Sequence, residues 1–143
     1  MRRFLVGAAI LAFGATVAAA GPAEDREALM KERGKIVGAL TKVAKGEDAF
    51  DAAAVLDQLK ALQANADKVD VDVLWPAGSQ GDTEASPKIW EDAAGFKAAT
   101  DKFKADTAAA VAAPPADAAA LQASLSTVAK NCGGCHEVYR VKK

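Results

Sequence analysis

The pentapeptide Cys132-Gly133-Gly134-Cys135-His136, near the end of the chain, constrains the fold more than any other stretch of the sequence. The pattern C-x-x-C-H is the attachment signature of a c-type haem. The two thiols add to vinyl groups of the porphyrin as thioethers, and the adjacent neutral imidazole can ligate the iron. A chain with this motif must therefore surround a flat macrocycle that cannot leave.

Three other interpretations of the motif explain less. A zinc site needs four ligands, but Cys132 and Cys135 are the only cysteines and His136 is the only histidine. A thioredoxin-like redox pair needs a βαβ context, and the surrounding sequence has no strand pattern. A structural disulfide would leave the adjacent histidine unexplained. The sequence therefore predicts one covalently bound haem c per chain.

The first 20 residues are typical of a cleaved secretory signal peptide. Arg2 and Arg3 precede an apolar run that ends in small residues, and we expect cleavage after Ala20. The run is too short and too rich in Ala and Gly to span a membrane, so no membrane span is expected after cleavage. Since this kind of haem attachment is completed outside the bacterial cytoplasm, the predicted location is the periplasm.

The remaining residues, 21–143, are enough for a single domain. Removing the signal peptide removes two arginines and no acid, so the formal net charge falls from −1 to −3. Basic stripes with interleaved aromatic residues are absent from the sequence, which argues against nucleic acid as a partner.

The composition and periodicity of this domain predict an all-α fold. Helices are expected at 24–44, at 51–67, from Ser86 as a cap to about residue 113, and from Asp117 to the C-terminal region. The stretch 68–86 is expected to be an extended loop. In the third helix, the residues expected to face inward are Trp90, Ala93, Ala94, Thr100, Phe103 and Thr107.

The fourth helix places the haem motif on its apolar face. Its apolar residues, both cysteines included, recur in steps of four and three: Leu121, Leu125, Val128, Cys132, Cys135 and Tyr139. Four amphipathic helices with short first and last connections imply an antiparallel four-helix bundle, and the covalently attached haem would form part of its core.

A haem motif on the last helix of such a bundle resembles the class II c-type cytochromes, that is cytochrome c′ and its low-spin, six-coordinate relatives. Several further stretches are similar to that family: Arg26-Glu27-Ala28-Leu29-Met30-Lys31, Lys45-Gly46-Glu47, Phe50-Asp51-Ala52, Leu74-Trp75-Pro76 and Pro87-Lys88-Ile89-Trp90. The resemblance covers the whole mature chain.

The resemblance implies roles for individual residues. Cys132 and Cys135 would hold the haem, and His136 would be the proximal iron ligand. Arg26 matches an arginine that reaches a haem propionate, and Glu27 lies at a position where relatives often have Gln. Without the family, Arg26 would be interpreted as a solvated helix charge.

The resemblance also implies a loop at the edge of the haem. The stretch Asp82-Thr83-Glu84 matches that loop, which makes Thr83 and Glu84 candidate haem contacts.

The sixth coordination position decides between two functions. Six-coordinate members of the family supply methionine there and carry electrons between redox partner proteins, whereas five-coordinate members bind gases such as nitric oxide or carbon monoxide. Met30 stands at this position and is the only methionine after residue 20. We expect ligation by Met30, and core packing is the alternative. No motif for enzymatic catalysis is present.

Two glycines of the first helix point to close approaches. Gly34 and Gly38 share one face of the helix, and each costs about 1 kcal/mol relative to Ala. Because relatives often dimerise through their first two helices, we expect a homodimer at Gly38, and room for the haem beside Gly34.

Overall fold

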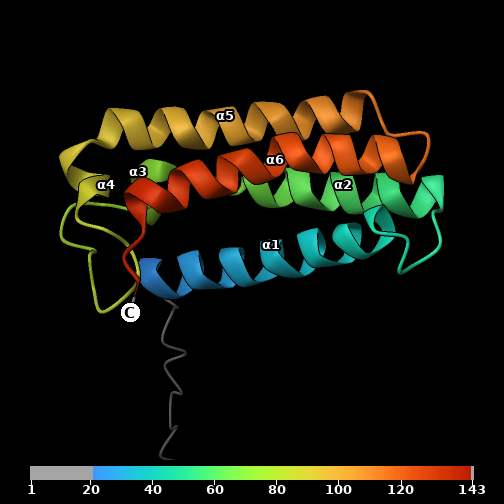
Figure 1. Ribbon diagram of the computed structural model, residues 1–143. Helices are drawn as coiled ribbons and strands as arrows, with labels where there is room; N and C mark the ends of the chain where they lie inside the picture. Colours follow the sequence, from blue (N-terminus) through green and yellow to red (C-terminus); the bar gives the residue numbers. More distant parts are fainter. Residues whose placement is uncertain (1–20, 143) are drawn as a thin grey trace, which may run out of the picture.

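The computed structural model describes residues 21–142, so the predicted signal peptide lies outside the described residues. The fold is a four-helix bundle, as predicted, made of α1 (Pro22–Ala44), α2 (Ala52–Asp67), α5 (Ala93–Ala112) and α6 (Ala118–Tyr139) (Figure 1). Successive long helices run in opposite directions, and both α1 and α5 pack against α2 and α6. None of the described helices is both long and apolar enough to span a membrane.

The helix ends follow from local chemistry. Asp51 and Asp117 cap α2 and α6, since their carboxylates accept hydrogen bonds from the backbone N–H groups three residues later, at 2.7 and 2.8 Å. Gly46 ends α1 in the left-handed conformation, at φ 74°, which glycine adopts without strain. These three boundaries lie where the sequence predicted them.

The core is aliphatic and is shared by the four long helices. Its least exposed side chains, at 2% or below, include Leu40, Leu59, Leu62, Leu121 and Val128. The apolar line predicted for the second helix is confirmed, because all its members are buried: Val55, Leu59, Leu62 and Ala66. This core fills one part of the bundle and leaves the other free to form the site.

The predicted third helix is wrong in one respect, because the chain breaks at Asp92. Asp92 has φ −129° and ψ 57°, so a short α4 (Lys88–Glu91) precedes α5. Its carboxylate accepts a hydrogen bond from Gly95 N at 3.1 Å and caps α5. The break changes the register: Ala93 and Ala94 are exposed, contrary to prediction, and Phe96 is buried at 3% exposure.

The predicted extended loop also contains a short helix, α3 (Val71–Leu74). Asp70 caps it by accepting hydrogen bonds from the N–H groups of Asp72 and Val73. Val69 and Leu74 are buried at either side of this turn. A capped turn with two buried anchors holds the chain against the bundle, which an extended segment would not do.

Candidate functional site

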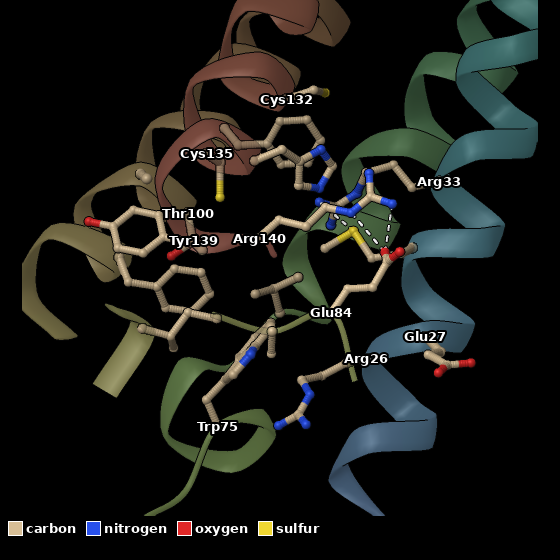
Figure 2. Close-up of a pocket in the computed structure, with 18 of the residues that line it drawn as sticks. Arg26, Glu27, Arg33, Trp75, Glu84, Thr100, Cys132, Cys135, Tyr139 and Arg140 are labelled. Atoms are coloured by element: carbon tan, nitrogen blue, oxygen red, sulfur yellow. Dashed lines mark hydrogen bonds and ion pairs between the residues drawn. The ribbon is translucent and has the colours of Figure 1, made fainter. Parts of the chain in front are cut away.

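A cavity of about 690 Å³ opens between α1, α5, α6 and the segment that joins α3 to α4. This volume lies within the range of roughly 300–1,000 Å³ that is usual for ligand sites. The structure brings all the predicted site residues to its wall: Arg26, Glu27, Met30, Thr83, Glu84, Cys132, Cys135 and His136. Figure 2 shows that Cys132 and Cys135 come from α6, and Arg26 and Glu27 from α1.

The two cysteines are held half-buried on the cavity side of α6, and no disulfide joins them. A Cβ added at Gly133 or Gly134 would meet nothing within 4 Å, so the two glycines occupy the outer side of the same turn. Burial raises the pKa of both thiols, although the charge of Arg33 opposes that shift. Among the described residues, no group of three or more His, Cys, Asp and Glu side chains could hold a metal ion.

The imidazole of His136 belongs to the same wall as the thiols. Burial lowers its pKa, and the positive charges of Arg140 and Arg33 lower it further, against a smaller opposing effect of Glu84. A lowered pKa favours the neutral imidazole, which is the form that ligates iron.

Arg26 is buried, at 5% exposure, and is not the solvated charge that an isolated helix position would suggest. Its guanidinium donates to Leu74 O at 2.9 Å, Ser79 Oγ at 3.1 Å and Ser79 O at 2.8 Å. Its Cζ also lies 5.7 Å from the ring centroid of Trp75 and 6.0 Å from that of Trp90. Arg26 therefore fastens the segment after α3 to the start of α1.

Glu27 and Thr83 lie at the edge of the cavity with local partners. The Glu27 carboxylate is exposed and pairs with Lys31 at 3.1 Å. Thr83 Oγ1 donates to Gln80 O and accepts from Ala85 N, both at 3.2 Å, which closes a small turn.

Glu84 has a partner that the sequence analysis missed, the arginine four residues after His136. Glu84 accepts from Arg140 at 2.6 Å (Figure 2). Beside this ion pair, Val141 N donates to Glu84 O at 2.9 Å and Ser86 N donates to Tyr139 O at 3.0 Å. The end of α6 is thus tied by side chains and backbone to the segment that borders the cavity.

An aromatic cluster closes the cavity near this tie. The Phe96 ring lies edge-on to Trp75, at 4.8 Å between centroids, and to Tyr139, at 5.1 Å. Tyr139 Oη donates to Asp92 Oδ2 at 3.0 Å, so the residue that breaks the third helix also anchors the fourth. Sequence analysis missed Phe96, because the break at Asp92 was not predicted.

Arg33 is a second arginine of the cavity wall that sequence reasoning did not assign to the site. Arg33 lies on the face of α1 that carries apolar residues in the turns before and after it. A charged residue on an apolar face was the signal available in the sequence. Its guanidinium lies over the Phe103 ring, at 4.3 Å from the centroid. Burial lowers its pKa, with opposing effects from Cys132 and Cys135.

The wall fits a haem in chemistry as well as in size. Among residues 21–142, two buried side-chain nitrogens lack a hydrogen-bond partner, Arg33 Nη2 and Trp75 Nε1, and both residues line the cavity. Buried donors are rarely left unpaired. The cavity thus offers an apolar wall, two thiols, an imidazole and donors for anionic groups, which are the contacts that a thioether-bound haem needs.

Comparison with known proteins agrees with this chemistry. The family model for cytochrome c′ matches residues 22–140. A cytochrome c-556 from Agrobacterium fabrum is 42% identical over 127 residues, which cover 89% of this chain and 86% of that protein. The chain therefore belongs to the cytochrome c′ family and carries a covalently attached haem c.

Solved structures show the same fold. Cytochrome c′ from Rhodopseudomonas palustris is 36% identical, with a TM-score of 0.78 over 87% of this chain and 99% of its own. A variant of cytochrome c prime from Alcaligenes xylosoxidans, solved as a nitric oxide complex, is 29% identical, with a TM-score of 0.74 over 86% and 98%. Haem proteins of this family serve electron transfer or gas binding.

Proposed function

We propose that this chain is an electron carrier whose haem iron is ligated by His136 and Met30. The observation that carries the proposal is the position of Met30 on α1, in the wall of the cavity that His136 also lines from α6. The sequence holds one histidine and two methionines, and Met1 precedes the bundle. Met30 is therefore the thioether available as a second axial ligand. The role needs no enzymatic turnover.

The chain's own residues would bind and orient the cofactor. Cys132 and Cys135 would fix one edge of it, while Trp75 Nε1 and Arg26, at the other end of the cavity, would face its carboxylates. When bound, the haem supplies a one-electron Fe(III)/Fe(II) couple. The aromatic cluster and the core around it exclude water, and thioether ligation by Met30 would raise the reduction potential.

The test is the optical spectrum of the holoprotein and of Met30→Ala. We expect a low-spin ferric spectrum for the wild type, and a high-spin spectrum with a lowered reduction potential for the variant. Val37→Ala is the matched control, because Val37 lies on the same helix and lines the same cavity but has no ligating atom. Identical spectra for wild type and Met30→Ala would show that Met30 only packs.

Gas binding at a five-coordinate iron is the second candidate. It is favoured by the few contacts of Met30, which is 37% exposed and whose Sδ has, among the polar groups of the described residues, one contact, with Arg33 Nη1 at 3.9 Å. Carbon monoxide added to the reduced protein separates the two candidates. A rapid, complete Soret shift at low concentration would favour gas binding, and slow or partial binding would favour ligation by Met30.

We further propose a periplasmic location and a homodimer. The first 20 residues support export, and the mass of the mature protein from a periplasmic fraction tests cleavage after Ala20. In the dimer, Gly38 would face the partner, since a Cβ there meets nothing within 4 Å of this chain. Gly38→Leu should then shift the sedimentation coefficient toward that of a monomer, and an unchanged value would contradict this interface. Redox proteins of the same compartment would be the partners.

A further inference from the structure

The side chain of Arg33 is a half-buried cation in the cavity wall, and the hydrogen-bonding capacity of its guanidinium is only partly used. Arg33 Nε donates to Asn65 Oδ1 at 2.9 Å, and the plane of the group lies over Phe103. Nη2 is buried and has no partner. Arginine stays protonated even when burial lowers its pKa, so the group keeps its charge and has a donor to spare.

A polar network holds this guanidinium in place. Asn65 is 1% exposed, and its amide nitrogen donates to Leu29 O at 3.1 Å and to Glu32 Oε2 at 2.8 Å. Glu32 is fixed in turn by Lys68 at 3.3 Å. Because both amide protons of Asn65 are engaged on the α1 side, its oxygen must face Arg33. The orientation of Arg33 is therefore set by contacts from two helices.

The charge of Arg33 has no counterion among the described residues. Within the part of the chain that the structure describes, no carboxylate forms an ion pair with it. Arg140, another arginine of the cavity wall, is paired with Glu84. A charged donor atom held out of water without a partner is costly, and an anion bound beside Nη2 would reduce that cost.

The carboxylates of the haem are poor candidates for this anion. Figure 2 shows Arg33 toward the end of the cavity where Cys132 lies, away from Trp75 and Arg26. A haem carries its propionates on the side opposite its vinyl groups. Arg26 and Trp75 lie together at the other end of the cavity and are better placed to meet them.

The contact with Met30 indicates on which side of the cavity Arg33 lies. Arg33 Nη1 lies 3.9 Å from Met30 Sδ, and the two residues are neighbours on α1. We propose that Arg33 forms a subsite for a small monovalent anion, such as azide or nitrite, next to the iron position that Met30 would otherwise fill. Arg33 would donate a charge-assisted hydrogen bond to the anion, and the bound haem would supply the ferric iron that the anion ligates. The step is ligand binding, without electron transfer.

The experiment uses the ferric holoprotein in a Met30→Ala background, which opens the position whether or not Met30 ligates in the wild type. Azide is titrated and followed at the Soret band, and Arg33→Met is compared with the parent. We expect azide affinity to fall about tenfold or more, which is about 1.4 kcal/mol, because hydrogen bonds between charged partners are the strong ones. Arg33→Lys keeps the charge and should lose less.

Two controls isolate the anion effect. Arg140→Met removes a charge of the same sign from the same wall, but one already neutralised by Glu84, and should change azide affinity less than Arg33→Met. Carbon monoxide is neutral, so its affinity for the ferrous protein should be the same with and without Arg33. If Arg33→Met does not fold, Arg33→Gln removes the charge and keeps a donor for Asn65.

Equal azide affinities in the parent and in the folded neutral variant would overturn the proposal. So would a parallel loss of carbon monoxide affinity, because it would mean that Arg33 only shapes the cavity. Neither result bears on ligation by Met30, which is tested separately by the spectrum of Met30→Ala alone.

Discussion

Gly95 occupies a place in the first turn of α5 where a side chain would collide with the tie between α5 and α6. An added Cβ would lie 2.6 Å from Tyr139 Oη and closer still to the Asp92 carboxylate, although contacts under 3.0 Å are essentially never seen. Alanine is otherwise the better helix former, by about 1 kcal/mol. Gly95→Ala therefore combines a stabilising effect, the helix preference of alanine, with a destabilising one, the steric contact of the added Cβ. The contacts in the structure determine the sign of the net change in stability.

The cost of Gly95→Ala comes from two bonds of one carboxylate. Asp92 Oδ1 caps the helix through Gly95 N, and Asp92 Oδ2 accepts from Tyr139. Disturbing a cap costs about 1 kcal/mol, and losing a hydrogen bond to a charged group costs about 1.5–3 kcal/mol. After subtraction of the helix preference, we expect a net loss of about 1.5–3 kcal/mol in the free energy of unfolding, estimated from the same values.

Urea unfolding of the holoprotein, followed by circular dichroism at 222 nm, measures this loss. Gly38→Ala is the matched control at a dilution where both proteins sediment as monomers, because nothing of the same chain lies within 4 Å of a Cβ there, and it should gain about 1 kcal/mol. Tyr139→Phe removes one of the two oxygens that the added Cβ would meet, so Gly95→Ala should cost less in that background. If Gly95→Ala stabilises the protein as Gly38→Ala does, the steric reasoning is refuted.

Two further predictions concern attachment and pH. Replacing Cys132 and Cys135 with Ala should release the haem on acid–acetone extraction and leave a poorly folded protein, since an unfilled core cavity costs several kcal/mol; a cooperative, well-folded apo-protein would contradict this. Hydrogen bonds from Lys102 and Asn131 hold the pKa of Asp106 below its ordinary 3.8, so its carboxylate stabilises the fold above that pH and less as the pH falls through it. The urea midpoints of wild type and Asp106→Asn should thus differ at pH 7 and converge in acid, and a gap independent of pH would exclude the ionic contribution.

The sequence was sufficient for the features that depend on local rules. The haem motif spans about one turn of helix, and each cap, at Asp51 and at Asp117, is defined within four residues. The apolar stripes of the helices can be recognised from their periodicity in the sequence. Each of these can be recognised without tertiary structure. The site residues named from the family resemblance all line one cavity, although their individual roles in binding haem remain predictions.

The features that the sequence did not predict depend on contacts between distant segments. The break at Asp92 pairs a cap with a hydrogen bond from Tyr139, 47 residues away. The pair of Glu84 and Arg140 joins residues 56 apart. Arg33 falls on the face of the first helix that carries apolar residues in the adjacent turns. The hydrogen bond that orients its guanidinium comes from Asn65 on another helix. Side chains of this kind have no local pattern to mark them.

The segment between α3 and α4 is fastened twice, by Arg26 at Leu74 and Ser79, and by the end of α6 at Glu84 and Ser86. Both fastenings come from helices that line the haem cavity. When the charge of the iron changes by one, the electric field on the surrounding dipoles changes. Dipoles that hydrogen bonds already hold in position do not need to reorient in response. The surroundings of the haem would then contribute little reorganisation energy, and electron exchange would be limited by the distance between partners instead of by motion of this loop.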